Sequence, residues 1–390
     1  MSTRLAVLPM ELIQQTQSAT DCNQLGAALH TLRAATAAPG AHPGQSDLCA
    51  DLKSGLPGLH SALSEFPEPF FGADGLLSYI VAACQPDVDI ELPLLVMRPE
   101  ADWEPSSVNS SVVITAVASL SRRDVQTILA RMFLCALPEL VSTGGRLSCA
   151  TLLGCPTHGA IGTAAEKLKC FLGYFCAMRA APDYWGAEIR FVRARSAAAK
   201  CWSAAMAEQP LADCSFEWGF EMQESRDAAV TDFANEQFGY GMIPSCTQEE
   251  MLMCARPEAL AGCAIAPVMQ AQEVVLVVGA RHMVHCTKPS SAEKFRYTGL
   301  CEEDQDPAIM IGVDAFKALL ELPVEAKTET QIRDINKLIV GFCHCFVTVL
   351  SLCPHLCRIC IHCITICCCL YSRYAINITS RSLLLLRPLL

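Results

Sequence analysis

The sequence predicts an α/β protein whose mainly helical first half is followed by a layered α/β second half. Apolar residues recur at helical spacing in the first half, and short β-branched runs alternate with helix-like segments after Pro182. The chain has 390 residues and is 52% hydrophobic. It is long enough for two domains and apolar enough to bury a core, because one domain usually takes about 100–200 residues.

Helices dominate the expected first half. Residues 1–75 should form short helices joined by mobile connectors such as APGAHPGQSD (38–47). The best helix is predicted over 119–138, with Ser121 as N-cap and Pro138 as stop. Its apolar face consists of Val125, Ile128, Leu129, Met132 and Phe133. A second helix, over 164–180, carries a stripe of Leu168, Phe171, Leu172 and Phe175. We interpret both stripes as core.

Strands are expected after Pro182. The runs rich in β-branched and aromatic residues are 188–194, 214–220, 228–234, 273–280, 293–299 and 308–315. Helix-like segments lie at 247–260 and 328–342. In such sheets, catalytic residues usually follow strand ends. Asp232 ends one run, and a glycine loop after it leads to three adjacent polar residues, Gln248, Glu249 and Glu250.

Charge and cysteine usage exclude some classes of protein. The formal net charge of -11 argues against a nucleic-acid surface, although backbone amides can still bind an anionic ligand. The N-terminus does not read as a signal peptide, so the 24 cysteines are expected to be mostly reduced and buried. His282, His285 and Cys286 offer mixed directions and no fourth ligand, and we therefore expect no metal and no cofactor.

The adjacent glutamates have two readings. Acidic residues in the first turn of a solvated helix interact well with the helix dipole, and this would need no function. Two carboxyl groups held together also suit acid catalysis, because like charges raise the pKa of one of them. The stretch on its own favours the first reading, and the rest of the chain favours the second.

The segment TDFANEQFGYGMIPSCTQEE (231–250) resembles the signature of the poly(ADP-ribose) glycohydrolase family. Further segments agree in order: LSRRDVQTILARMFLCALPE, EKLKCFLGYF, EVVLVVGARH, FRYTG, AIMIGVDA and RDINKLIVGF. The resemblance covers the chain from about Leu76 to Phe342. It implies a macrodomain-type mixed sheet between helices, preceded by a helical accessory domain. The expected divisions are a poorly defined segment 1–75, an accessory domain 76–185, a macrodomain 186–342 and a tail 343–390.

The resemblance also implies an activity, the hydrolysis of ribose–ribose O-glycosidic bonds of poly(ADP-ribose) to release ADP-ribose. Glu250 would be the catalytic acid, and Glu249 would hold ribose hydroxyls beside the scissile bond. Asp232 and Asn235 would contact ribose or orient the acid. Taken alone, Asn235 reads equally well as a cap or turn residue.

Further residues of the resemblance would bind the rest of the ligand. Gly239 and Gly241 would let a diphosphate approach backbone N–H groups, since a Cβ obstructs that approach. Gln248 completes the substrate-binding signature, and Phe220 and Glu221 would match an adenine-contacting pair.

The chain departs from the family at three positions of the site. Tyr240 replaces the middle glycine of the loop. Met283 and Cys286 stand where the family has tyrosines that stack on adenine.

The tail, residues 343–390, departs most from the family pattern. Nine cysteines lie between Cys343 and Cys369, and no carboxylate follows Asp334. The segment could be a membrane helix, a zinc site through Cys357, Cys360 and Cys363, or translated non-coding sequence, which the loss of acids favours.

Two function classes therefore stay open: an active glycohydrolase, and a catalytically defective ADP-ribose-binding module or truncated remnant. The expected partners are poly(ADP-ribose) and poly(ADP-ribosyl)ated proteins, in the nucleus or cytoplasm, without direct nucleic-acid binding and with membrane contact by the tail disfavoured.

Overall fold

The computed structural model describes twelve stretches of the chain and two single residues. They are 2–36, 52–85, 89–96, 112–137, 148–154, 158–181, 188–196, 229–239, 246–270, 272–287, 295–301 and 309–314, with Arg333 and Lys337. The connector 38–47, the expected strand 214–220 and the tail 343–390 lie outside them. Within the described ranges, no helix has the length and apolar character to cross a membrane.

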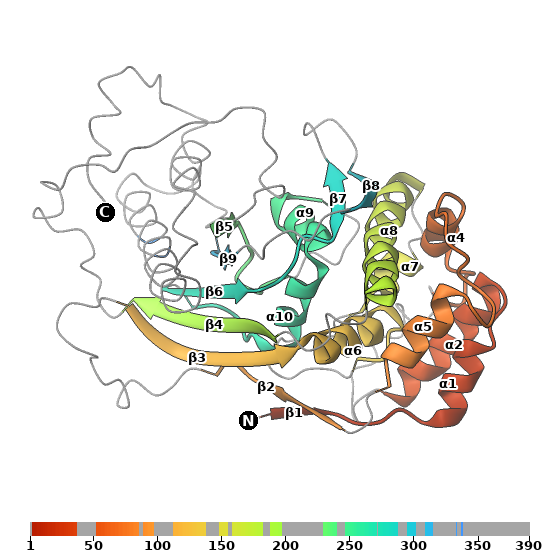
Figure 1. Ribbon diagram of the computed structural model, residues 1–390, viewed down its shortest axis with the longest axis horizontal. Coiled ribbons are helices and arrows are strands. Elements are labelled where there is room, and N and C mark those ends of the chain that lie inside the picture. Colours follow the sequence, from red (N-terminus) through yellow and green to blue (C-terminus); the bar gives the residue numbers. More distant parts are fainter. Residues whose placement is uncertain are drawn as a thin grey trace, which may run out of the picture.

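Helices gather at one end of the molecule and a twisted sheet occupies the other (Figure 1). The helices of this end are α1 (Met10–Gln17), α2 (Cys22–Ala35), α4 (Pro57–Leu63), α5 (Leu76–Ala83), α6 (Arg122–Phe133), α7 (Ala150–Leu153) and α8 (His158–Ala180). A two-stranded sheet of β1 (Ser2–Leu5) and β2 (Ile90–Pro93) was not predicted. The short helices expected in the first 75 residues are confirmed.

Helix α6 begins where the sequence predicts. The Ser121 hydroxyl accepts from the Asp124 N–H at 3.1 Å, and the Asp124 carboxylate accepts from the Ser121 N–H, which completes a capping box. The helix is shorter than the predicted 119–138, because residues 119–121 end a strand and Phe133 is the last helical residue. All five residues of its predicted apolar face are buried.

The end of α6 has a specific backbone cause. Cys135 adopts a left-handed conformation with φ of 57°. Its N–H donates to the Met132 carbonyl at 3.2 Å, and the Ala136 N–H donates to the Arg131 carbonyl at 2.7 Å. This is the Schellman pattern, in which the residue after the C-cap turns the chain away from the helix axis. The prediction was wrong here because glycine, and not cysteine, is the usual signal for it.

Helix α8 supplies the core of the helical end. It starts at His158, before the predicted 164, and its four-residue stripe is buried. The Phe133 ring of α6 lies 6.4 Å from the Phe171 ring and 6.2 Å from the Phe175 ring. Offset and edge-on aromatic contacts at this separation stabilise beyond the area that they bury.

The main sheet has the order β3-β4-β6-β9-β5. Its strands are β3 (Val112–Ser121), β4 (Glu188–Ser196), β5 (Ala229–Asp232), β6 (Glu273–Val278) and β9 (Ile309–Gly312). Neighbours run antiparallel except β5 and β9, which are parallel, so the sheet is mixed. β5, β6 and β9 are buried along almost their whole length, as is typical of strands covered on both faces.

Four of the six expected strands lie in this sheet. The predicted strand 293–299 forms β8 (Arg296–Leu300) instead in a separate hairpin with β7 (Val284–Thr287). The hairpin packs against α8 and against the helix that follows β5. β3 was missed, although its sequence VVITAVASLS is rich in β-branched residues.

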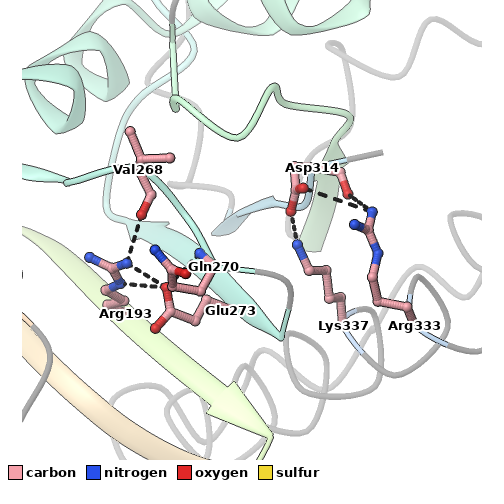
Figure 2. A network of polar contacts seen from close by, with 7 residues as sticks. All are labelled: Arg193, Val268, Gln270, Glu273, Asp314, Arg333 and Lys337. Atoms are coloured by element: carbon pink, nitrogen blue, oxygen red, sulfur yellow. Dashed lines mark hydrogen bonds and ion pairs between the residues drawn. The ribbon is translucent and has the colours of Figure 1, made fainter. Parts of the chain in front are cut away.

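A buried ion pair joins β4 to β6 (Figure 2). The Arg193 Nε donates to the Glu273 Oε2 at 3.0 Å, and both side chains are buried. The other guanidinium nitrogens donate to the carbonyls of Leu95 at 3.1 Å and Val268 at 2.9 Å. A guanidinium with all its nitrogens engaged is tolerated in a core, and breaking such a pair is costly.

A second charged cluster follows β9, where Asp314 makes ion pairs with Arg333 and Lys337 (Figure 2). Lys337 is buried, and burial lowers the pKa of its ammonium to about 8. The cysteines of the described stretches are free thiols, and all except Cys246 and Cys301 are buried, as expected.

Candidate active site

The site lies where β5 ends. Asp232 is the last residue of this strand, and its side chain is completely buried. Its backbone carbonyl accepts from the Val313 N–H at 2.9 Å, which continues the pairing with β9 past Gly312. Neither carboxylate oxygen of Asp232 has a hydrogen-bond partner within the described stretches. A buried carboxyl group without donors is costly, and such groups are typical of functional sites.

Helix α9 (Gln248–Ala255) brings the adjacent glutamates to this strand end, and the 3₁₀ helix η6 (Pro257–Ala261) and α10 (Gly262–Ile265) follow it. Gln248 fixes the junction: its amide donates to the Thr231 carbonyl at 2.8 Å and its Oε1 accepts from the Phe233 N–H at 2.9 Å. The described contacts of Gln248 are thus to the backbone on both sides of Asp232. Its predicted contact with substrate stays a prediction.

Glu249 accepts hydrogen bonds from two residues of the loop that follows β5. Its Oε1 accepts from the Gly239 N–H at 2.8 Å, and its Oε2 accepts from the N–H and side-chain amide of Asn235, both at 3.3 Å. Gly239 has φ of 71°, and a Cβ there would overlap the Cys263 sulfur. Glycine is therefore required at this position for packing, whether or not a diphosphate approaches it.

Glu250 belongs to a capping box at the start of α9. Its Oε2 accepts from the Thr247 N–H at 2.6 Å and contacts the Thr247 hydroxyl. The same side chain lines a cavity of about 10 Å³ together with Gly239, Glu249 and Lys167. Such a volume holds about one water molecule. Glu250 is 6% exposed, so it is no solvated helix start.

Burial and neighbouring charge raise the pKa values of Asp232 and Glu249. Burial raises the pKa of Asp232 well above its ordinary value, and the charges of Glu249 and Glu250 raise it further. Burial also raises the pKa of Glu249 from 4.5 to about 7, with the charge of Glu250 acting in the same direction. Near neutral pH the cluster therefore retains protons that isolated carboxyl groups would have lost.

Lys167 of α8 is a member of the site that was not predicted. It is 2% exposed, lines the same cavity as the glutamates, and its charge lowers the pKa of Glu249. A signal was present, because Lys167 precedes Phe171 by one helical turn and so falls beside the apolar stripe of α8. A lysine at a core position indicates an anionic partner.

The remaining predicted residues are only partly placed. Asn235 and Gly239 lie against Glu249, as described. Gly241, Phe220 and Glu221 fall outside the described stretches, as does Tyr240. Cys286, predicted to stand at an adenine-stacking position, is buried in a small cluster with Met251, Cys254 and Phe295.

The mixed, helix-covered sheet with a carboxyl cluster at the end of β5 defines an α/β macro domain. Residues 202–351 match the family model described as poly(ADP-ribose) glycohydrolase, macro domain fold. A stretch of 141 residues is 28% identical to poly(ADP-ribose) glycohydrolase 1 of Arabidopsis thaliana. Through this region the chain is similar to poly(ADP-ribose) glycohydrolases.

The extent of these matches is limited. The stretch similar to the Arabidopsis protein covers 34% of this chain and 25% of the length of that relative. The family match contains Asp232, Glu249 and Glu250 and ends at residue 351, inside the segment 343–390.

Proposed function

We propose that this protein is a poly(ADP-ribose) glycohydrolase that hydrolyses ribose–ribose O-glycosidic bonds and releases ADP-ribose, with Glu250 as general acid. One observation carries the proposal: Asp232, Glu249 and Glu250 are buried together at the end of β5, within the stretch that matches the family. Poly(ADP-ribosyl)ated proteins in the nucleus or cytoplasm would be its partners.

The chemistry needs a proton for the leaving ribose oxygen and stabilisation of an oxocarbenium-like transition state. In the proposal, Glu250 gives its proton to that oxygen as the bond to the anomeric carbon breaks. A water molecule then adds to the anomeric carbon and returns a proton to the carboxylate. The products are ADP-ribose and the remaining polymer.

The surroundings of Glu250 suit this role. Its two contacts to Thr247 both use Oε2, while the side chain lines the cavity. The capping box thereby fixes the carboxyl group, since a residue held by a helix terminus loses rotamer freedom. Glu249, already hydrogen-bonded to Asn235 and Gly239, would exchange part of this network for ribose hydroxyls, and Asp232 would contact ribose or orient the acid.

The test is release of ADP-ribose from poly(ADP-ribose) by the purified full chain, compared with Glu250→Gln. The variant keeps the shape of the side chain and removes its acid, so turnover should fall by at least about 100-fold, the usual contribution of general acid catalysis. Glu91→Gln, an exposed carboxyl group of β2, serves as the matched control and should retain activity. Equal turnover by parent and Glu250→Gln would refute the assignment.

A second function is favoured by the departures of the chain from the family's site pattern at Tyr240, Met283 and Cys286. It is a catalytically defective ADP-ribose-binding module. Calorimetry would decide: heat of ADP-ribose binding to a folded chain without turnover supports the module. Membrane contact by the tail, which the sequence disfavours, concerns residues outside the described stretches.

A further inference from the structure

Two histidines and a cysteine meet beside the β7–β8 hairpin, in residues that the glycohydrolase proposal does not use. They are His282, His285 and Cys301, and their potential ligand atoms all lie within 4.8 Å of one another. The two imidazole rings are 5.1 Å apart and nearly perpendicular. His282 is buried, whereas His285 and Cys301 are half-buried, so one side of the cluster faces solvent.

The hairpin register creates this cluster. Val284, the first residue of β7, pairs with Leu300, the last residue of β8. Cys301, which follows β8, therefore lies beside the residues that precede β7. Its N–H donates to the carbonyl of Met283 at 3.1 Å. Because Met283 lies between His282 and His285 in the sequence, this bond holds Cys301 close to both histidines. Opposite His285 stands Gly299, where a Cβ would meet nothing within 4 Å, and the imidazole therefore has room.

The hydrogen bond of His282 orients its ring and fixes its tautomer. Its Nε2 lies 3.0 Å from the Val284 carbonyl oxygen. A carbonyl can only accept, so Nε2 carries the hydrogen and Nδ1 keeps its lone pair. Imidazoles that bind metals usually donate their other N–H to a backbone carbonyl or carboxylate in this way, and the bond orients the ring.

Cys286, the cysteine nearest to these histidines in sequence, takes no part. Successive residues of a strand point to opposite faces, and Cys286 follows His285 directly. Its sulfur contacts the Met251 carbonyl at 3.6 Å inside a buried cluster. The cysteine that meets the two histidines in space is therefore Cys301, from across the hairpin, and not Cys286 of the sequence pattern HMVHC.

We propose that His282, His285 and Cys301 form a zinc site of two imidazoles and one thiolate, with a water molecule in the fourth position. Zn²⁺ binds these donors in tetrahedral geometry, with ligand atoms about 3.3–3.6 Å apart from the usual Zn–N and Zn–S lengths. Small side-chain rotations would shorten the separations between the ligand atoms, which are at most 4.8 Å, to these values. On binding, the Cys301 thiol releases its proton to solvent and its sulfur forms the bond to zinc.

The site would fasten the hairpin to the core of the macro domain. Met283, which lies between the two histidines, donates its N–H to the Ala255 carbonyl at the end of α9. Zinc would thus tie the end of β8 to the segment that holds the last turn of the helix carrying Glu249 and Glu250. The proposal itself concerns metal binding and does not depend on catalysis.

The experiment measures the alkylation rate of individual cysteines in the full chain, by iodoacetamide labelling and peptide mass spectrometry, with zinc and after its removal by a chelator. The labelling must be assigned to individual cysteines because residues 343–390 contain further cysteines. Zinc should slow alkylation of Cys301 by at least about ten-fold, because a metal-bound thiolate is withdrawn from reaction. Cys246, also half-buried, is the internal control and should change less than two-fold by the same argument.

The His285→Gln variant should lose the protection of Cys301 by zinc. As a second measurement, the parent chain loaded with cobalt should show a thiolate-to-cobalt absorption band that Cys301→Ser removes in part and Cys286→Ala does not. Unchanged alkylation of Cys301 in zinc, or protection that survives His285→Gln, would overturn the proposal. Neither readout uses ADP-ribose release, so the outcome is separate from that of the proposed glycohydrolase.

Discussion

Replacing Glu249 by glutamine should make the stability of the protein less dependent on pH. The pKa of Glu249 rises from 4.5 to about 7 in the folded protein. A carboxyl group with a raised pKa binds its proton more tightly when folded, so its contribution favours folding at low pH and is lost as pH rises towards 7. The parent should therefore lose stability between pH 5 and pH 8 through this group, and Glu249→Gln should not.

The magnitude follows from the two pKa values. The difference between a pKa of 4.5 and one of about 7 corresponds to about 3 kcal/mol at full ionisation, and most of this develops between pH 5 and pH 8. The free energy of unfolding of Glu249→Gln, minus that of the parent, should grow by this amount over the interval. The altered bonds to Gly239 and Asn235 add a term independent of pH, which cancels from the slope.

The assay is urea denaturation followed by circular dichroism at pH 5, 6, 7 and 8, conditions chosen to span the two pKa values. Glu91→Gln serves as an exposed control and should give a flat difference. A difference for Glu249→Gln that varies by less than about 0.5 kcal/mol would refute the reasoning, because the pKa shift and the slope are linked thermodynamically.

Three further changes test other parts of the structure. Gly239→Ala should lower the free energy of unfolding in urea by more than about 1 kcal/mol, because φ is positive and the new Cβ overlaps a neighbouring sulfur. The control Gly162→Ala, whose Cβ enters open space, should be neutral or stabilising. Equal effects of the two changes would contradict this. Arg193→Leu should lower the free energy of unfolding by about 3–5 kcal/mol, because Glu273 stays buried without its partner. The double variant Arg193→Leu/Glu273→Leu should lose less stability in the same urea titrations. Equal losses in the two variants would argue against an uncompensated charge. Lys167→Met should shift the acid–base profile of ADP-ribose release to higher pH, since its charge lowers the pKa of the neighbouring glutamate; an unmoved profile would remove the lysine from the site.

Local signals predicted the parts of the fold that depend on short stretches. The capping box at Ser121 and the buried faces of α6 and α8 involve residues within a few turns of one another, so their spacing is informative. The end of α6 was not predictable in the same way. Cys135 occupies a left-handed position, which its residue type does not indicate.

The candidate site shows the same division. The family resemblance identified Asp232, Asn235, Glu249 and Glu250 as neighbours, and the structure brings these residues to one strand end. Lys167 reaches it from α8, far away in sequence, and only tertiary packing makes it a member. Cys301 reaches the histidine pair through the hairpin register, which the sequence pattern did not specify.

The paired bonds of Gln248 have a consequence for how the protein can vary. This amide holds the start of α9 to the backbone on both sides of Asp232, and Glu249 separately holds Gly239. Both ends of the segment 240–245 are thus anchored independently of its own residues. Insertions or replacements within it should leave the carboxyl cluster in place, because lengthening an anchored connection costs little conformational entropy. The segment 240–245, which contains Tyr240, is thus a suitable place to introduce new ligand specificity without rebuilding the acid site.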